Sequence, residues 1–124
     1  MKTSHSVPSA APSLADFLSA IDGAITVCDA DLNLLYMNEK SKATFGGPGG
    51  APAVGDCLAG CHKPASVEKM KAIIAEGKPN VYTISKGGVR KLIWQAPWTK
   101  DGAIAGLVEI SLPLPASMPH YDRG

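Results

Sequence analysis

Three short polar turns divide much of the chain into segments that alternate between apolar and polar residues. The turns are Asp29-Ala30-Asp31, Lys86-Gly87-Gly88 and Lys100-Asp101-Gly102. Asp and Gly favour such turns because they tolerate positive φ or fold a side chain back onto the backbone, which lets neighbouring strands run antiparallel. The flanking segments predict strands over residues 24–28, 32–37, 81–85, 89–98 and 103–112.

Pro97 interrupts the fourth of these segments. Proline has no backbone N–H to donate to a neighbouring strand, so it is confined to sheet edges, bulges and strand ends. We therefore expect the strand over residues 89–98 to meet an edge, a bulge or its own end near Pro97.

The first helical pattern begins at Ser13, which has the position of an N-cap with Asp16 as its capping-box partner. Gly23 stands where a C-terminal glycine would end the helix. Apolar residues recur between these points at helical spacing, and they are Leu14, Phe17, Leu18 and Ile21. This stripe would cover the chain's own sheet or pair with the same stripe on a second copy.

Two further helices are expected between the second and third strands. Asn38 is a suitable N-cap for a short helix over residues 39–44. Ser66 is the predicted cap of a longer helix that ends at Gly77, and its apolar face consists of Val67, Met70, Ile73 and Ile74. Residues 46–56 are too rich in Gly and Pro for regular structure, so we expect a loop there that borders a ligand site.

The composition points to one globular domain. The chain has 124 residues, of which 45% are hydrophobic, and a formal net charge of +1. A charge so close to zero excludes the basic field that nucleic-acid binding requires. No apolar run is long enough for a secretory signal or a membrane span, so we expect a cytoplasmic protein with no membrane association. We expect a flexible arm over residues 1–12, a domain over 13–115 and a tail over 116–124.

The order of these elements, with a helix, two strands, helices and three strands, resembles that of PAS domains. Two stretches carry the resemblance, AITVCDADLNLLYMNEKSKATFG (residues 24–46) and KDGAIAGLVEISLPL (residues 100–114). The first is similar to the opening PAS hairpin, where an acidic turn follows strand one and an Asn follows strand two. The second resembles the closing hairpin. The match runs from about residue 14 to 114 and so spans nearly the whole chain.

This resemblance implies an α+β fold with a five-stranded antiparallel sheet and helices packed on one face. It also implies a sensory role, in which a small ligand or cofactor binds between sheet and helices and the signal leaves across a homodimer or to a partner protein. A subgroup of PAS domains is similar in the middle of the chain as well, where Cys61, His62, Pro64 and Ser66 match its Cys-His pattern. That match implies a pocket lip at these residues.

Haem b is one candidate cofactor. Covalent attachment requires Cys-x-x-Cys-His, and the spacing from Cys57 to Cys61 is one residue too long. Non-covalent haem needs only an axial imidazole, here His62 beside Cys61, and an apolar slot. The residues expected to form the slot are Ile73, Ile74, Leu92, Trp94, Leu107 and Ile110. In the simpler interpretation, His62 is a partly exposed loop residue that hydrogen-bonds the backbone near the helix start.

Cys57, Cys61 and His62 also form a candidate metal site. Zinc prefers four ligands, and the fourth would have to be His120 or Cys28. A thiol switch between Cys57 and Cys61 is a further alternative, which predicts a mobility difference between oxidised and reduced protein that Cys57→Ser removes. Cys28, on a strand, is expected to be a small buried core residue.

Trp94 and Trp98 lie four residues apart on one predicted strand, so both side chains are expected on the same face. They would line the pocket if that face is the inner one, and would mark a partner or dimer surface if it is the outer one. The sequence contains no G-x-S-x-G, phosphate-loop or His-Glu-x-x-His motif, so we expect a binding domain and no enzyme. The alternative function is a ligand-free dimerisation or docking module.

Overall fold

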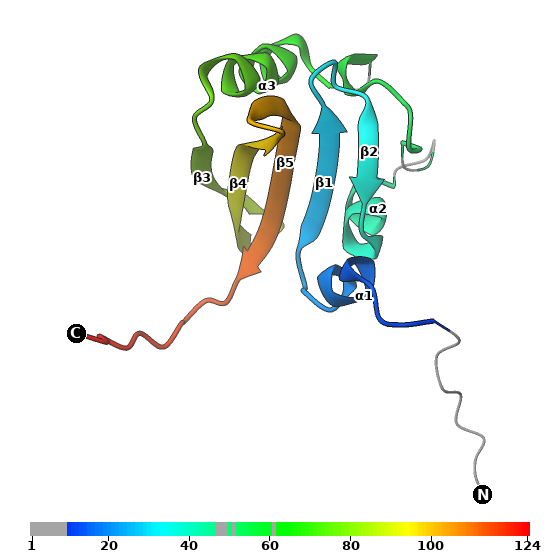
Figure 1. Ribbon diagram of the computed structural model, residues 1–124. Coiled ribbons are helices and arrows are strands. Elements are labelled where there is room, and N and C mark those ends of the chain that lie inside the picture. Colours follow the sequence, from blue (N-terminus) through cyan, green and yellow to red (C-terminus); the bar gives the residue numbers. More distant parts are fainter. Residues whose placement is uncertain (1–9, 47–49, 51, 61) are drawn as a thin grey trace, which may run out of the picture.

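The structure, a computed structural model, describes residues 10–46, 50, 52–60 and 62–124. The described part contains the predicted mixture of helices and strands (Figure 1). In chain order the elements are α1 (Leu14–Ser19), β1 (Ala24–Asp29), β2 (Leu34–Met37), α2 (Glu39–Phe45), the short 3₁₀ helix η1 (Leu58–Gly60), α3 (Pro64–Glu76), β3 (Asn80–Lys86), β4 (Val89–Lys100) and β5 (Ala103–Leu114).

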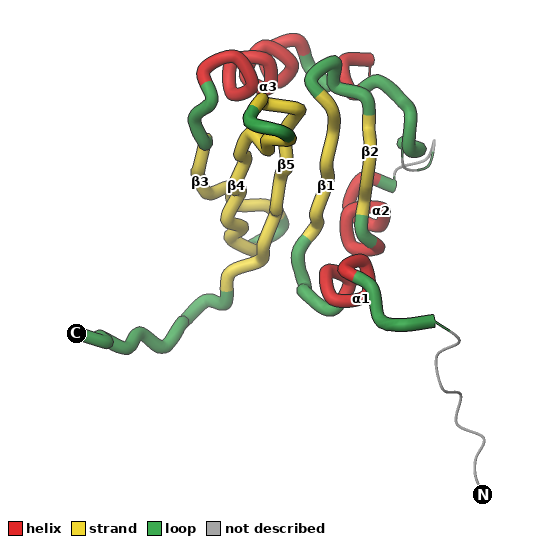
Figure 2. Tube along the Cα trace, viewed as in Figure 1, coloured by secondary structure: helices red, strands yellow, loops and turns green. Residues whose placement is uncertain are grey.

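The five strands form one antiparallel sheet in the order β2-β1-β5-β4-β3 (Figure 2). The last strand, β5, lies at the centre and pairs with both β1 and β4. In Figure 1, α3 lies near one end of β4 and β5, while α1 lies near the opposite end of the sheet. The predicted α+β fold with a five-stranded antiparallel sheet is confirmed.

β4 continues through Pro97 to Lys100, two residues further than expected. Pro97 pairs with Leu107 of β5, but β3 begins at Asn80, which lies opposite Gln95, and does not reach Pro97. Since β4 is locally an edge at this position, the missing N–H costs no hydrogen bond on the β3 side. The pairing with β5 also shifts register directly after Trp98, so the sheet is irregular where the proline predicted it.

The capping box of α1 forms as predicted. Ser13 Oγ accepts a hydrogen bond from the Asp16 amide at 3.3 Å, and the Ser13 amide donates to Asp16 Oδ2 at 2.7 Å. The helix ends at Ser19, however, and does not continue to Gly23. Gly23 is instead a buried residue directly before β1. No residue of α1 is buried, so its apolar stripe does not cover the sheet.

The predicted cap of α3 is wrong. The helix begins at Pro64 with Lys63 at the N-cap, and Ser66 lies inside the first turn. Proline suits the first helical position because its missing N–H would have no partner there and its φ already matches the helix. The predicted end is confirmed: Gly77 has φ 70° and its amide donates to the Ile73 carbonyl at 2.9 Å.

The hydrophobic core lies between the sheet and α3. Its buried members are Cys28, Leu32, Leu34, Met37, Leu58, Val67, Met70, Ile73 and Leu107, with Ile74 packed against them. The predicted apolar face of the long helix is therefore the face that packs on the core. No helix in the part of the chain that the structure describes has the length and apolar character to cross a bilayer.

The side chain of Asn38 is 2% exposed and lies at the junction of three elements. Its Oδ1 accepts from the Ile25 amide and from the Ser41 amide, both at 2.9 Å. Its Nδ2 donates to the Gly23 carbonyl at 2.8 Å and to the Leu18 carbonyl at 3.4 Å. Asn38 thus caps α2 as predicted, and it also ties the end of β2 to the start of β1.

We predict that Asn38→Asp destabilises the fold by about 2–4 kcal/mol. Aspartate keeps an acceptor for the Ile25 and Ser41 amides, but it places an oxygen against the Gly23 carbonyl where the amide now donates. Urea unfolding at pH 7 measures the difference in free energy of unfolding. A loss below about 0.5 kcal/mol, the range of ordinary surface substitutions, would contradict this role for Asn38.

Candidate functional site

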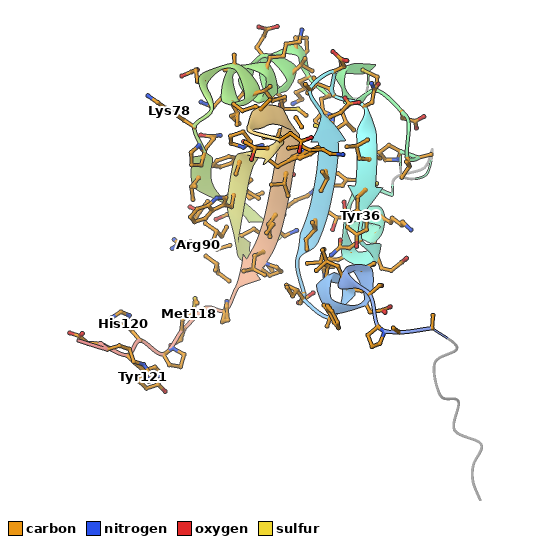
Figure 3. The ribbon with its side chains drawn as sticks, in the orientation of Figure 1. Tyr36, Lys78, Arg90, Met118, His120 and Tyr121 are labelled. Carbon is orange, nitrogen blue, oxygen red and sulfur yellow. The ribbon has the colours of Figure 1, made fainter. Side chains whose placement is uncertain are left out.

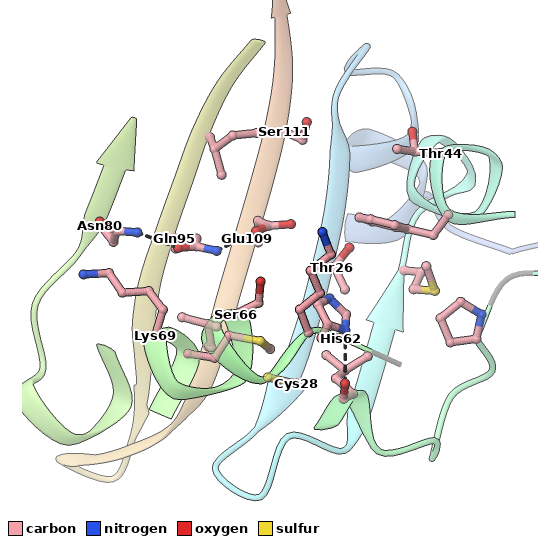
Figure 4. Close-up of a pocket in the computed structure, with 18 of the residues that line it drawn as sticks. Thr26, Cys28, Thr44, His62, Ser66, Lys69, Asn80, Gln95, Glu109 and Ser111 are labelled. Atoms are coloured by element: carbon pink, nitrogen blue, oxygen red, sulfur yellow. Dashed lines mark hydrogen bonds between the residues drawn. The ribbon is translucent and has the colours of Figure 1, made fainter. Parts of the chain in front are cut away.

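A cleft of about 1300 Å³ opens between α3 and the sheet (Figure 4). Every strand contributes to its lining, together with α2, α3 and the segment that leads into α3. Alternate residues of β1, β3, β4 and β5 face it, as the pleat of a β-strand requires, and β2 contributes Met37. On β5 these residues are Leu107, Glu109 and Ser111, and on β4 they are Lys91, Ile93 and Gln95.

A row of polar side chains crosses the floor of the cleft. Asn80 Nδ2 donates to Gln95 Oε1 at 2.9 Å, and Gln95 Nε2 donates to Glu109 Oε1 at 2.7 Å. The three residues are direct cross-strand partners on β3, β4 and β5, so the register of the sheet brings them into line. Gln95 is 8% exposed, which makes its amide a buried group with a partner at each end.

This row was not among the residues predicted from the sequence. The sequence does contain a signal for it, because Gln95 is the one polar residue of the stretch LIWQAPW and Glu109 is the one charged residue of β5. A polar residue on the buried face of a strand requires partners, and this makes it a candidate for a site. What the sequence does not reveal is that the two residues lie opposite each other.

The charge of Glu109 acts on two neighbouring side chains in the cleft. Burial raises the pKa of the Tyr82 hydroxyl, and the negative charge of Glu109 raises it further. Burial also raises the pKa of the Cys28 thiol to about 11, with smaller contributions from neighbouring groups that include Glu109. Cys28 is 2% exposed, so the prediction that it is a buried core residue is confirmed. With so high a pKa, its thiol is mostly protonated at neutral pH and unreactive.

His62 lies at the cleft, two residues before α3. Its Nδ1 is 3.0 Å from the Leu58 carbonyl oxygen. A carbonyl oxygen only accepts, so His62 Nδ1 is the donor in this hydrogen bond. The simpler interpretation, a loop histidine bonded to nearby backbone, therefore describes its contact with Leu58.

Only some of the residues predicted to form an apolar slot come together. Leu107 and Ile73 share the hydrophobic core and Ile74 packs against it, but of these three only Leu107 lines the cleft. The prediction for Leu92 and Trp94 is wrong. Because Ile93 and Gln95 face the cleft, their neighbours on the strand face the opposite side of the sheet.

The two tryptophans of β4 differ in their surroundings. Trp94 is 49% exposed on the outer face, where it pairs with Ile110. Trp98 is partly buried, and its Nε1 donates to the Cys28 carbonyl at 3.0 Å. Trp98 crosses over Gly106, where an added Cβ would lie 2.7 Å from the indole nitrogen and would overlap the Cys28 carbonyl. Only glycine leaves room for this contact.

The candidate metal site is not assembled by the residues that the structure describes. Cys57 is exposed, with its Sγ 3.8 Å from the Asp31 carbonyl oxygen, and Cys61 lies outside the described residues. His120 lies on the C-terminal tail, away from the cleft (Figure 3). Among the described residues, no group of three or more His, Cys, Asp or Glu side chains is placed to hold a metal ion. A site or thiol switch that includes Cys61 stays a prediction.

No protein-family model matches the chain, and no curated protein matches it. Solved structures do. The PAS domain of histidine kinase ThkA is 15% identical, with a TM-score of 0.59 over 72% of this chain and 96% of that domain. The PAS domain of BvgS from Bordetella pertussis is 18% identical, with a TM-score of 0.57 over 80% of this chain and 82% of that one. The chain has a PAS fold.

A third PAS structure is the Aer2 receptor from Vibrio cholerae, described as a dual PAS-heme oxygen sensor. It is 15% identical, with a TM-score of 0.57 over 75% of this chain and 95% of that one. Identities this low establish the shared PAS fold and leave the ligand open. The resemblance to a subgroup with a Cys-His pair also stays a prediction.

Proposed function

We propose that this PAS domain is a sensor that binds a small molecule in the cleft between α3 and the sheet. The observation that carries the proposal is the cleft itself, about 1300 Å³ in volume with a hydrogen-bonded polar row on its floor. Small-molecule sites are typically concave, with a largely apolar lining and a few convergent polar groups that orient the ligand. The similarity to PAS domains of a histidine kinase and a receptor supports a sensory role.

The cleft also offers a route for the signal. A ligand in it would contact α3 on one side and β4 and β5 on the other. If it binds one arrangement of α3 more tightly, that arrangement becomes more populated, and a partner protein can detect the change. We propose binding without catalysis, since the polar groups of the floor bond one another and the buried thiol of Cys28 has a raised pKa. A cytoplasmic location is part of this proposal.

Haem b is a second candidate, favoured by the position of the His62 imidazole at the cleft. Bound haem would supply an iron able to hold a small gas molecule. The axial position fits, but the slot fits poorly, because the floor carries Gln95 and Glu109 where a porphyrin needs apolar side chains. Trp94, which was expected in the slot, lies on the other face of the sheet.

The apolar stripe of α1 favours a homodimer as the way the signal is passed on. Leu14 and Phe17 of α1 are 69% and 58% exposed, and Ile21, two residues after the end of the helix, is 47% exposed. These residues recur at helical spacing in the sequence, but they do not cover the chain's own sheet. Pairing with the same residues of a second copy would remove their apolar side chains from water. The same stripe would serve a ligand-free docking module, the alternative function.

Filling the cleft should abolish ligand binding. A screen of small metabolites against the unchanged protein identifies those that raise its melting temperature. We predict that Ser66→Trp, which projects a large ring from α3 into the cleft, removes this thermal stabilisation. A ligand at 100 times its dissociation constant stabilises by about 2.7 kcal/mol. Ala65→Trp, one position along the same helix and exposed, is the matched control and should keep the effect. Equal binding by both variants would place the ligand elsewhere.

For haem, the decisive measurement is the absorption spectrum of protein purified from cells supplied with a haem precursor. If His62 is the axial ligand, we expect a Soret band that disappears or shifts in His62→Ala. Colourless protein would exclude haem as the resident cofactor and leave the small-molecule proposal intact.

The dimer is tested by Phe17→Asp. A charge in the middle of an apolar interface has no partner and must be desolvated, so we expect the variant to sediment as a monomer where the unchanged protein sediments as a dimer. Ala43→Asp, at an exposed position of α2 outside the cleft lining, controls for the added charge. Identical sedimentation of all three proteins would exclude α1 as the interface.

A further inference from the structure

We propose that the cleft recognises an organic cation, a small molecule whose protonated amine contacts Glu109 while an apolar body lies against Leu107 and Met70. This inference rests on the proposed binding function of the cleft and names the chemical class of its ligand. Three features of the described residues carry it: the direction of the polar row, the absence of a counter-ion for Glu109, and the apolar lining beside the row.

The direction of the polar row follows from its hydrogen bonds. An ionised carboxylate only accepts, so the amide of Gln95 must turn its NH₂ towards Glu109 and its oxygen towards Asn80. Asn80 must then turn its own NH₂ towards Gln95, which leaves its oxygen beyond the row. Both ends of the row are consequently acceptors, the amide oxygen of Asn80 and the second carboxylate oxygen of Glu109. A ligand that meets these ends must donate hydrogen bonds.

Glu109 has no cationic partner among the described residues. The ion pairs of the described chain are Lys40–Asp22, Lys42–Glu39 and Lys71–Glu68, all outside the cleft floor. Figure 4 shows the Glu109 carboxylate between Gln95 on one side and Thr26 on the other. The Thr26 hydroxyl shares a hydrogen bond of 2.6 Å with Ser41. A partly buried carboxylate with a single neutral donor is one that a bound cation stabilises.

None of the lysines that line the cleft forms an ion pair with this carboxylate. Lys91 precedes Gln95 by four residues on the same strand, which at about 3.3 Å per residue places their Cα atoms about 13 Å apart. Lys86 lies further along the same end, at the turn into β4. Lys69 is exposed on α3. Lys63, the N-cap residue of α3, also lines the cleft and is exposed. The negative charge of Glu109 is therefore not neutralised by an ion pair with any of the four described lysines of the lining.

The apolar part of the lining sets the rest of the ligand. Leu107 precedes Glu109 by two residues on β5 and faces the same way, and it is 3% exposed. Met70 faces it from α3, and Ile93 lies beside Gln95 on β4. An ammonium group at Glu109 would thus leave the remainder of the molecule beside aliphatic and thioether side chains. Methionine adapts readily to ligands of different shape.

The inference is tested with probes that share one skeleton and differ only in the polar group. 2-Phenylethylamine, 3-phenylpropanoate and 2-phenylethanol form one set, and hexylamine, heptanoate and hexanol form another. Titration followed by ¹H–¹⁵N NMR gives each dissociation constant and shows whether the shifted amides belong to cleft residues. We expect the amines to bind most tightly, with shifts centred on Gln95 and Glu109.

Two variants separate the carboxylate's charge from the fold. Glu109→Gln keeps an oxygen that accepts from Gln95 but removes the charge, so we expect amine binding to weaken at least about tenfold and alcohol binding to stay within about twofold. Glu76→Gln, at the exposed end of α3 and outside the cleft lining, makes the same charge change and should leave all six constants unchanged.

The failures are distinguishable. Carboxylates or alcohols that bind as tightly as the amines, or amine binding that Glu109→Gln leaves unchanged, would overturn the organic-cation assignment while retaining the cleft as a ligand site. If no probe shifts the cleft amides, both the assignment and the proposed binding function are overturned.

Discussion

The buried side-chain amide of Asn38 connects α1, β1 and α2. It accepts from the Ile25 amide of β1 and the Ser41 amide of α2, and it donates to the Leu18 carbonyl of α1 and to the Gly23 carbonyl just before β1. A buried polar group that lacks a hydrogen-bond partner destabilises the folded state, so these contacts favour the arrangement that satisfies all of them. They hold β1 against α2, which sets Thr26 beside Ser41 at the edge of the cleft.

The cleft depends equally on strand register. A slip of one residue between β4 and β5 would turn Gln95 or Glu109 to the outer face and break the polar row. Trp98 supplies a check on this register, because its indole N–H reaches the Cys28 carbonyl across β5 only where Gly106 leaves room. The bulge next to Trp98 adjusts the end of β4 to this contact. The hydrogen bond from Trp98 to the Cys28 carbonyl and the polar row on the cleft floor are thus consistent with the same register of β4 and β5.

These constraints give the cleft a polar floor and apolar sides. Its floor carries a carboxylate and two amides in a fixed hydrogen-bond direction, and its sides carry Leu107 and Met70. Such a surface suits an amphipathic hydrogen-bond donor better than a porphyrin, even though the His62 imidazole lies at the cleft. The PAS fold does not by itself specify the ligand, which depends on the residues that line the cleft. The three PAS structures compared above are 15% to 18% identical to this chain.

Features that depend on neighbours in the sequence were predictable. The three polar turns, the capping box of Ser13 and Asp16, the cap at Asn38 and the glycine that ends α3 are local, so their residues alone determine the backbone that they favour. The order of these elements was sufficient to predict the five-stranded PAS fold. Local patterns failed where two of them competed, as at the start of α3, where Pro64 initiates the helix ahead of Ser66.

The site was decided by tertiary structure. Alternation shows that Leu92 and Trp94 share one face of β4 and Gln95 the other, but it does not show which face α3 covers. Nor does it align Asn80, Gln95 and Glu109, which lie up to 29 positions apart (109 − 80) and meet only through strand pairing. The sequence by itself determined the elements, because propensities and turns act over a few residues. The tertiary structure determined the cleft, because its chemistry arises where distant strands pair.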